Sequence, residues 1–103
     1  MNIEAPTMTA REVESALLTR CAAVAWEASP AAQDQREANV FRLAAMVLQS
    51  RSPRESKNLM CASEQYFATH PNERLVPGEV VRNGWVLGLP RLRDMLSNQL
   101  HGR

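Results

Sequence analysis

The chain has 103 residues, of which 45% are hydrophobic and 22% are charged, and its formal net charge at pH 7 is +1. This composition is typical of an ordinary globular protein, and the length predicts one domain with a modest hydrophobic core. The 12 basic and 11 acidic residues are interspersed. This argues against a nucleic-acid binder, because such proteins concentrate positive charge on one face.

The cysteines and the N-terminus indicate the cellular compartment. Cys21 and Cys61 stand far apart, whereas a secreted framework has more cysteines and a zinc site has paired ligands at short spacing. We expect two reduced thiols, with a Cys21–Cys61 disulfide as the alternative. Glu4 and Pro6 stand where an export signal has a basic start and an apolar core. The longest apolar-rich stretch, 16–28, is too short to span a bilayer. We therefore predict a cytoplasmic protein without membrane contact.

Residues 1–8 carry no periodicity and are expected to form a flexible N-terminal tail before a single helical domain at 9–103. A first helix is predicted at 10–28, because Thr9 and Glu12 form a capping box at its start. One face of this helix carries Val13, Leu17, Cys21, Val24 and Ala28. Another side is also apolar and carries Leu18, Ala22, Ala25 and Trp26. The helix is therefore either buried on two sides or presents a second apolar face to another chain.

A second helix is expected from residue 30 or 31 to residue 50, because Ser29 and Pro30 stand together at the head of an apolar-periodic run. Met46 lies outside the apolar arc of this helix. The arc is wide enough to contact two neighbours and consists of Val40, Phe41, Leu43, Ala44, Val47 and Leu48.

A third helix is predicted at 53–69. Ser52, Pro53 and Glu55 supply its N-cap, its first position and its third position. Cys61 is expected to point outward with Ala68. The inward side of the helix is expected to carry Leu59, Met60, Ser63, Tyr66 and Phe67.

Residues 75–89 admit two structures. An Asn-Gly pair between β-branched residues is the strongest short signal for a β-hairpin, here at 79–88. Alternatively, Pro77 and Glu79 open a short helix, and Gly88 ends it in the left-handed conformation. We favour the helix, because an isolated hairpin is only marginally stable and no third strand is predicted.

A last helix is expected at 90–100, with Leu92, Met95, Leu96 and Leu100 on one face. The predicted fold is an all-α bundle of four or five short helices, with the small β-hairpin at 79–88 as the alternative for that segment. A Pro/Gly-rich corner at 71–78 separates the third helix from the segments that follow.

The run at 87–90 resembles the turn of a helix-turn-helix motif spanning 79–99. A small DNA-binding transcription regulator is therefore an alternative function. Asp94 and Ser97 depart from the motif, whose recognition helix is usually apolar at these two positions. A plain helical corner inside a bundle uses the same capping chemistry.

No catalytic or cofactor motif is visible, and we predict a protein that is not an enzyme and holds no cofactor or metal. His70 and His101 are the only histidines, and neither has a motif-level partner such as a nucleophile elbow. The four glycines form no phosphate-binding loop.

The two tryptophans are the candidates for contact with a partner. Tryptophan is enriched at interface hot spots, and exposed methionine suits an adaptable contact surface. Trp26 points away from the main apolar stripe of its helix, which favours a contact role over a core role. The predicted partner-binding residues are Leu18, Ala22, Trp26, Met46, Arg82 and Trp85.

In size, helical makeup and absence of catalytic motifs, the chain resembles the small antiactivators that sequester LuxR-type quorum-sensing regulators. It also resembles phage-encoded inhibitors of host defence complexes. The first resemblance implies a regulator of transcription that occupies the dimerisation or DNA-binding surface of its target and silences it sterically. The expected partner is another protein, such as a transcription regulator, or a second copy of the chain in a homo-oligomer.

Overall fold

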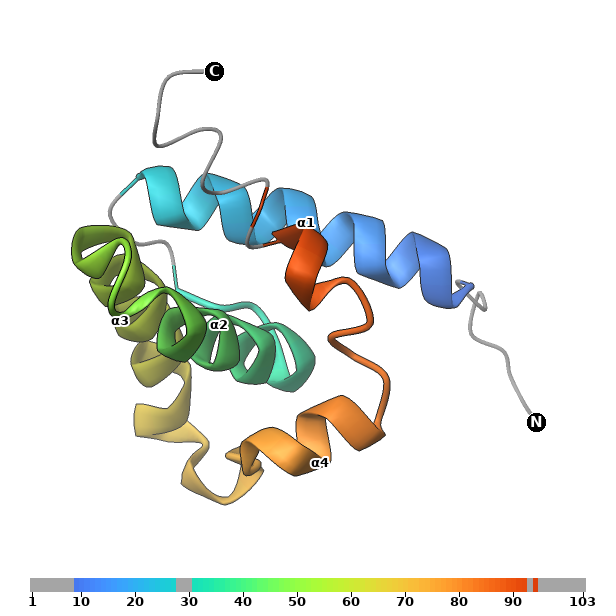
Figure 1. The fold of residues 1–103 in the computed structure, drawn as a ribbon. Coiled ribbons are helices and arrows are strands. Elements are labelled where there is room, and N and C mark those ends of the chain that lie inside the picture. Colours follow the sequence, from blue (N-terminus) through green and yellow to red (C-terminus); the bar gives the residue numbers. More distant parts are fainter. Residues whose placement is uncertain (1–8, 28–30, 93, 95–103) are drawn as a thin grey trace.

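The computed structural model describes residues 9–27, 31–92 and 94. Within them the chain forms helices and no strand, which confirms the predicted all-α class (Figure 1). The predicted tail at 1–8 and most of the predicted helix at 90–100 lie outside the described residues. The elements in chain order are α1 (Ala10–Trp26), α2 (Gln35–Leu48), α3 (Pro53–Thr69), the single-turn 3-10 helix η1 (Pro71–Glu73) and α4 (Pro77–Arg82).

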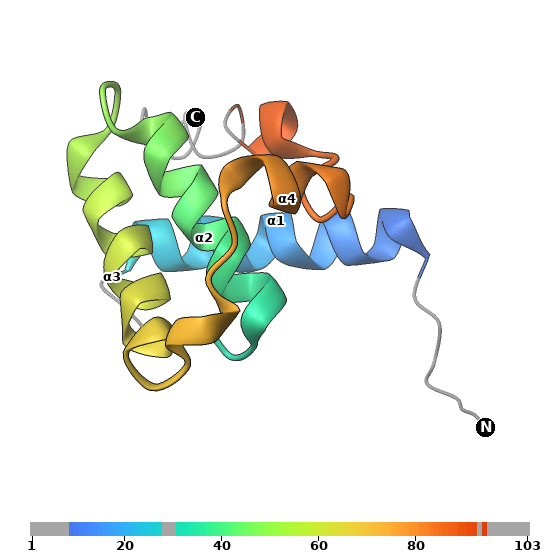
Figure 2. The ribbon, with the colours of Figure 1, turned by 90° about the horizontal axis from the view of Figure 1, so that it is seen from below.

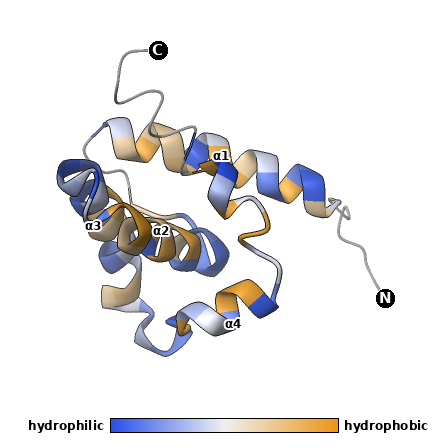
Figure 3. Ribbon diagram, in the orientation of Figure 1, coloured by the Kyte–Doolittle hydropathy of each residue, from blue (hydrophilic) through white to orange (hydrophobic). Residues whose placement is uncertain are grey.

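Helix α2 lies at the centre of the structure. Figure 2 shows it between α3 and α4, and α1 packs against both α2 and α3. Hydrophobic residues dominate the visible turns of α2 in Figure 3. No helix in the described part of the chain is long and apolar enough to cross a membrane. The core contains the largest fully buried side chains, among them Phe41, Phe67, Leu48, Leu59 and Val24.

The starts of α1 and α3 agree with the predicted positions. The Thr9 hydroxyl accepts a hydrogen bond from the Glu12 N–H at 3.1 Å, and the Glu12 carboxylate accepts one from the Thr9 N–H at 2.9 Å. The predicted capping box is therefore present at α1. At α3 the Ser52 side chain makes no capping hydrogen bond. The helix nevertheless begins at Pro53, whose ring holds φ near its helical value.

Helix α2 begins later than predicted, at Gln35 and not at residue 30 or 31. The reason is a better cap: the Asp34 carboxylate accepts a hydrogen bond from the Glu37 N–H at 2.8 Å, and a carboxylate is favoured at a helix N-terminus. The preceding Ala32 N–H donates instead to the Ala62 carbonyl of α3 at 3.1 Å. This bond ties the loop to α3.

Helix α4 ends at Arg82, the left-handed glycine that follows it is Gly84 rather than Gly88, and no hairpin forms at 79–88. Gly84 adopts a φ of +74°, and its N–H donates to the Val81 carbonyl at 2.9 Å. The Trp85 N–H donates to the Val80 carbonyl at 3.3 Å. These two bonds form a Schellman motif. The Asn-Gly pair therefore stops a helix here instead of turning a hairpin.

The segment after α4 packs on the middle of α1. Val86 and Leu92 are buried and line a small hollow together with Leu18 of α1. Gly88 allows this close approach, because a Cβ added there would lie 2.7 Å from Cδ of Glu14. The glycine predicted to end a helix instead makes room for a carboxylate.

A buried asparagine holds the chain between α3 and α4 against α2. The Asn39 side chain is 2% exposed. Its amide nitrogen donates to the carbonyls of Gln35 and Glu73, both at 2.9 Å, and its oxygen accepts from the Leu75 N–H at 2.8 Å. We call this set of bonds the Asn39 clasp. It holds residues 73–75, which come just before α4, against α2.

Candidate functional site

Two of the predicted partner-binding residues belong to the core. Leu18 is 6% exposed and Ala22 is 4% exposed. The expectation that they lie on a free surface is therefore corrected. Helix α1 is buried on two sides, because α2 and α3 cover one part of it and residues 85–92 cover another. Of the two alternatives for this helix, burial on two sides is the one observed.

The other four predicted residues do not gather in one place. Trp26 is 60% exposed at the end of α1, and Met46 is 45% exposed on α2. Arg82 is exposed on α4. Trp85 is half-buried against the core, and the guanidinium of Arg36 lies 5.6 Å from the centroid of its ring. Trp85 is thus mainly a packing residue, whereas Trp26 and Met46 belong to two separate surfaces.

The first surface is the outer side of α1, where every residue is exposed. Small side chains lie between Glu12 and Trp26, so that this side of the helix is nearly flat. Arg20 borders it, but its charge is engaged by its own chain, since Nε lies 3.3 Å from Oε2 of Glu37. We call this surface the α1 outer face; it consists of Glu12, Ser15, Ala16, Thr19, Ala23 and Trp26.

The second surface consists of two hollows that α2 helps to line. One hollow lies between α2 and α3, and the other lies between α2 and the segment that contains Leu75 and α4. The larger has a volume of about 430 Å³. We call the two hollows together the α2 groove. The larger is lined by Ala45, Gln49, Pro53, Ser56, Lys57, Met60 and Cys61, and the smaller by Asn39, Arg42, Leu43, Met46, Leu75, Pro77 and Val80.

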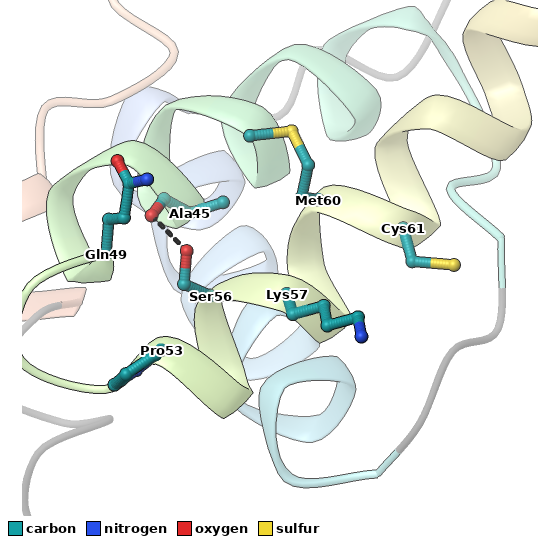
Figure 4. A pocket seen from close by; sticks show the side chains of 7 residues that line it. All are labelled: Ala45, Gln49, Pro53, Ser56, Lys57, Met60 and Cys61. Carbon is teal, nitrogen blue, oxygen red and sulfur yellow. Dashed lines mark hydrogen bonds between the residues drawn. The ribbon is translucent and has the colours of Figure 1, made fainter.

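Figure 4 shows how the larger hollow is built. The Met60 side chain extends from α3 towards α2, and the Ser56 hydroxyl donates a hydrogen bond to the carbonyl of Ala45. Lys57 and Cys61 lie at the outer side of the hollow, one helical turn apart. The Cys61 sulfur accepts a hydrogen bond from Nε2 of Gln65 at 3.6 Å. The buried serine thus joins the two helices, while the methionine provides adaptable apolar surface.

Both thiols of the chain are free, and their environments differ as expected. Cys21 is buried with 0% exposure, whereas Cys61 is exposed. Burial is the main reason that the pKa of Cys21 lies well above its usual value, and the carboxylate of Glu37 adds to the effect. The predicted outward position of Cys61 is confirmed.

Histidine and acidic side chains near η1 are engaged in structural contacts. The Tyr66 hydroxyl donates to a carboxylate oxygen of Glu73, and this hydrogen bond is the main reason that the pKa of Tyr66 is raised to about 12. The His70 ring stacks on Tyr66 with centroids 4.2 Å apart. Nδ1 of His70 lies 2.9 Å from the Thr69 hydroxyl. Within residues 9–27, 31–92 and 94, no group of three or more His, Cys, Asp or Glu side chains is placed to hold a metal ion.

The predicted helix-turn-helix segment does not have the usual spacing. Helix α4 ends at Arg82, and the next helical residue is Leu89. The connection therefore has six residues, whereas a helix-turn-helix motif uses a turn of about three or four. His101 and the rest of the expected recognition helix after Asp94 lie outside the described residues.

The chain matches no protein-family model, no curated protein and no solved structure. The residues of the α2 groove and of the α1 outer face are therefore the basis for a functional proposal. Sequence reasoning singled out only one residue from each surface, Met46 and Trp26. A clear signal for the α1 outer face is the recurrence of exposed small residues at Ala16, Thr19 and Ala23, with helical spacings of three and four.

Proposed function

We propose that this protein is a small, non-catalytic regulator that binds another protein and blocks it sterically. The proposal follows the resemblance to antiactivators of LuxR-type regulators, and its target would be a transcription regulator. The part of the target that is covered would lose its access to DNA or to a second subunit. Such a mechanism requires binding of the regulator to its target and no catalysis by the regulator.

The observation that supports this function best is the α2 groove. Met46 is 45% exposed there, between two hollows with helical walls. Grooves between helices that offer apolar surface hold helical segments of partner proteins in several recognition modes. Methionine side chains adapt to different partners because they are flexible and polarisable. The groove therefore supports protein binding better than small-molecule chemistry.

The exposed Trp26 supports the same function from a second surface. An indole ring that is 60% exposed adds little to the core, and tryptophan is the residue most enriched among interface hot spots. If the target also contacts Trp26, the Trp26→Ala change weakens binding by about 2 kcal/mol, which corresponds to roughly 30-fold in the dissociation constant.

The test is affinity purification from the native host with four forms of the protein. These are the wild type, Met46→Glu, Trp26→Ala and the control Arg11→Gln, which removes an exposed charge at the start of α1. We expect the wild type and the control to retain the same target, and the other two variants to lose it. Mass spectrometry identifies the target, and sedimentation separates binding to another protein from self-association.

Two results would contradict the proposal. A strictly monomeric protein that retains no specific target from the lysate is not a binding regulator. Equal retention by all four forms would mean that neither surface is used. Retention of duplex DNA with steep salt dependence would favour the alternative of a DNA-binding regulator.

A further inference from the structure

The α2 groove lacks negative charge on the side chains that line it. Lys57 and Arg42 are its charged residues, and among the described residues neither forms an ion pair. Glu64, farther along α3, is bonded to Arg74 at 2.9 Å. The groove therefore presents apolar surface bordered by positive charge that its own chain does not neutralise.

Arg42 is the clearest sign of a missing counter-group. Its Nε is buried and has no hydrogen-bond partner, although a guanidinium normally directs its donors to carboxylates or carbonyls. A buried donor without a partner is destabilising, and a carboxylate is the acceptor that forms the strongest bonds with it. This side chain lines the smaller hollow beside Met46.

The backbone of the groove determines the conformation of its occupant. Most of the lining belongs to helices, with Gln49 and Leu75 as the exceptions. Helical backbone groups are bonded within the helix and offer no edge for an added strand. An extended guest would leave its own amides unpaired against apolar surface, which is unfavourable. A helical guest bonds its backbone internally and needs only an apolar side towards the groove.

We propose that the α2 groove binds an amphipathic helix of the partner protein whose apolar side is flanked by glutamate or aspartate. This inference rests on the proposed function of protein binding, and it adds the chemistry of the segment through which the target binds. Apolar side chains of the guest lie against Met46 and Met60, and its carboxylates pair with Arg42 and Lys57. The floor from residue 42 to residue 49 spans about 12 Å, which matches a guest contact of two to three helical turns.

The probes for the test are two fluorescein-labelled synthetic peptides of about 18 residues, long enough for helix formation. They share their leucine positions and carry either glutamate or lysine at the flanking polar positions. Fluorescence anisotropy measures their binding to the full chain at low and high salt. We expect the glutamate peptide to bind at least ten-fold more tightly than the lysine peptide. We expect added salt to reduce this difference.

Variants locate the binding. Arg42→Gln and Lys57→Gln should each weaken binding of the glutamate peptide by about five-fold or more, as expected for loss of one charge pair at a partly exposed site. Met46→Glu should abolish it. Arg11→Gln removes one positive charge at the start of α1 and should leave binding unchanged. Circular dichroism establishes that each variant is folded. Lys57 is exposed, so Lys57→Gln should fold like the wild type.

Three outcomes overturn the inference: equal affinity for both peptides, no binding of either peptide, or equal loss in Arg11→Gln and the groove variants. Failure of this inference can be distinguished from failure of the proposed function. If Met46→Glu still loses a host protein that the wild type retains, the protein is a binding regulator and the acidic helix is the wrong occupant.

Discussion

The two tryptophans provide a sharp test of the fold, because they are chemically identical and differ in environment. Trp26 is 60% exposed, whereas Trp85 is half-buried against the core with Arg36 over its ring. We expect Trp26→Ala to lower the free energy of unfolding only slightly and Trp85→Ala to lower it strongly. Each variant retains one tryptophan of the two in the chain, so its fluorescence has a single source.

The expected loss of stability in Trp26→Ala follows from the area of the Trp26 side chain that the fold covers. Complete burial of tryptophan removes up to about 250 Å² from water, so a ring that is 60% exposed has roughly 100 Å² covered. At about 25 cal/mol per Å² this corresponds to an upper limit near 2.5 kcal/mol, and a compact unfolded state reduces it to about 1.5 kcal/mol. Truncation of a buried aromatic residue to alanine is destabilising by about 3–5 kcal/mol. Trp85 is half-buried, so Trp85→Ala should lower the free energy of unfolding by about 3 kcal/mol.

Urea unfolding followed by circular dichroism measures both values. Acrylamide quenching gives an independent reading: Trp26 in the Trp85→Ala protein should be quenched readily, and Trp85 in the Trp26→Ala protein should be protected. If Trp85→Ala does not fold, Trp85→Phe provides a milder variant. Equal losses of stability for Trp26→Ala and Trp85→Ala would place Trp26 in the core and refute the reasoning.

Three further predictions concern packing, pH and thiol reactivity. Gly88→Ala should be destabilising by about 1–3 kcal/mol in urea unfolding, because the added methyl overpacks the carboxylate contact on α1; unchanged stability would mean that this carboxylate moves aside freely. Tyr66, the one tyrosine of the chain, should ionise at about pH 12, and Glu73→Gln should return the midpoint of the phenolate absorbance towards 10. The hydrogen-bonded neutral phenol stabilises the fold below pH 10, and this contribution is lost as the pH rises towards 12; equal midpoints in both proteins would contradict the bond. A thiol reagent should label Cys61 rapidly and Cys21 only after unfolding, whereas rapid labelling of both would mean that the buried position is wrong.

The boundaries of α1 and α3 could be predicted because local chemistry determines them. The capping box at Thr9 and the proline at residue 53 act within a few residues of the helix starts. The start of α2 could not be predicted in the same way. Its position depends on the competition between a serine–proline pair and Asp34, and the hydrogen bond from Ala32 to α3 favours the later start.

The candidate site was less predictable than the fold. Periodicity correctly indicated that Trp26 points away from the core, because it lies far around α1 from the main apolar stripe. It could not exclude Leu18, which lies against residues 85–92 where they fold back over α1, or Ala22, which is buried by tertiary packing. The α2 groove is still harder to infer, since part of its lining, Leu75, Pro77 and Val80, is distant in the sequence from the lining residues of α2 and α3. Met46 was recognised, but the charged groups beside it were not.

The Asn39 clasp has a consequence for the dynamics of the groove. Helix α4 has one buried residue, Val80, whereas α2 has nine. Besides the Asn39 clasp, a Gln35–Glu73 hydrogen bond of 3.4 Å and one buried valine hold this part of the chain to the core, so that release of α4 would expose little apolar area. Sub-global openings of this kind occur well below the free energy of global unfolding and are visible as early amide hydrogen exchange. We therefore expect α4 to move away from α2 and back while the other helices stay folded. Guests of different width could then enter the α2 groove.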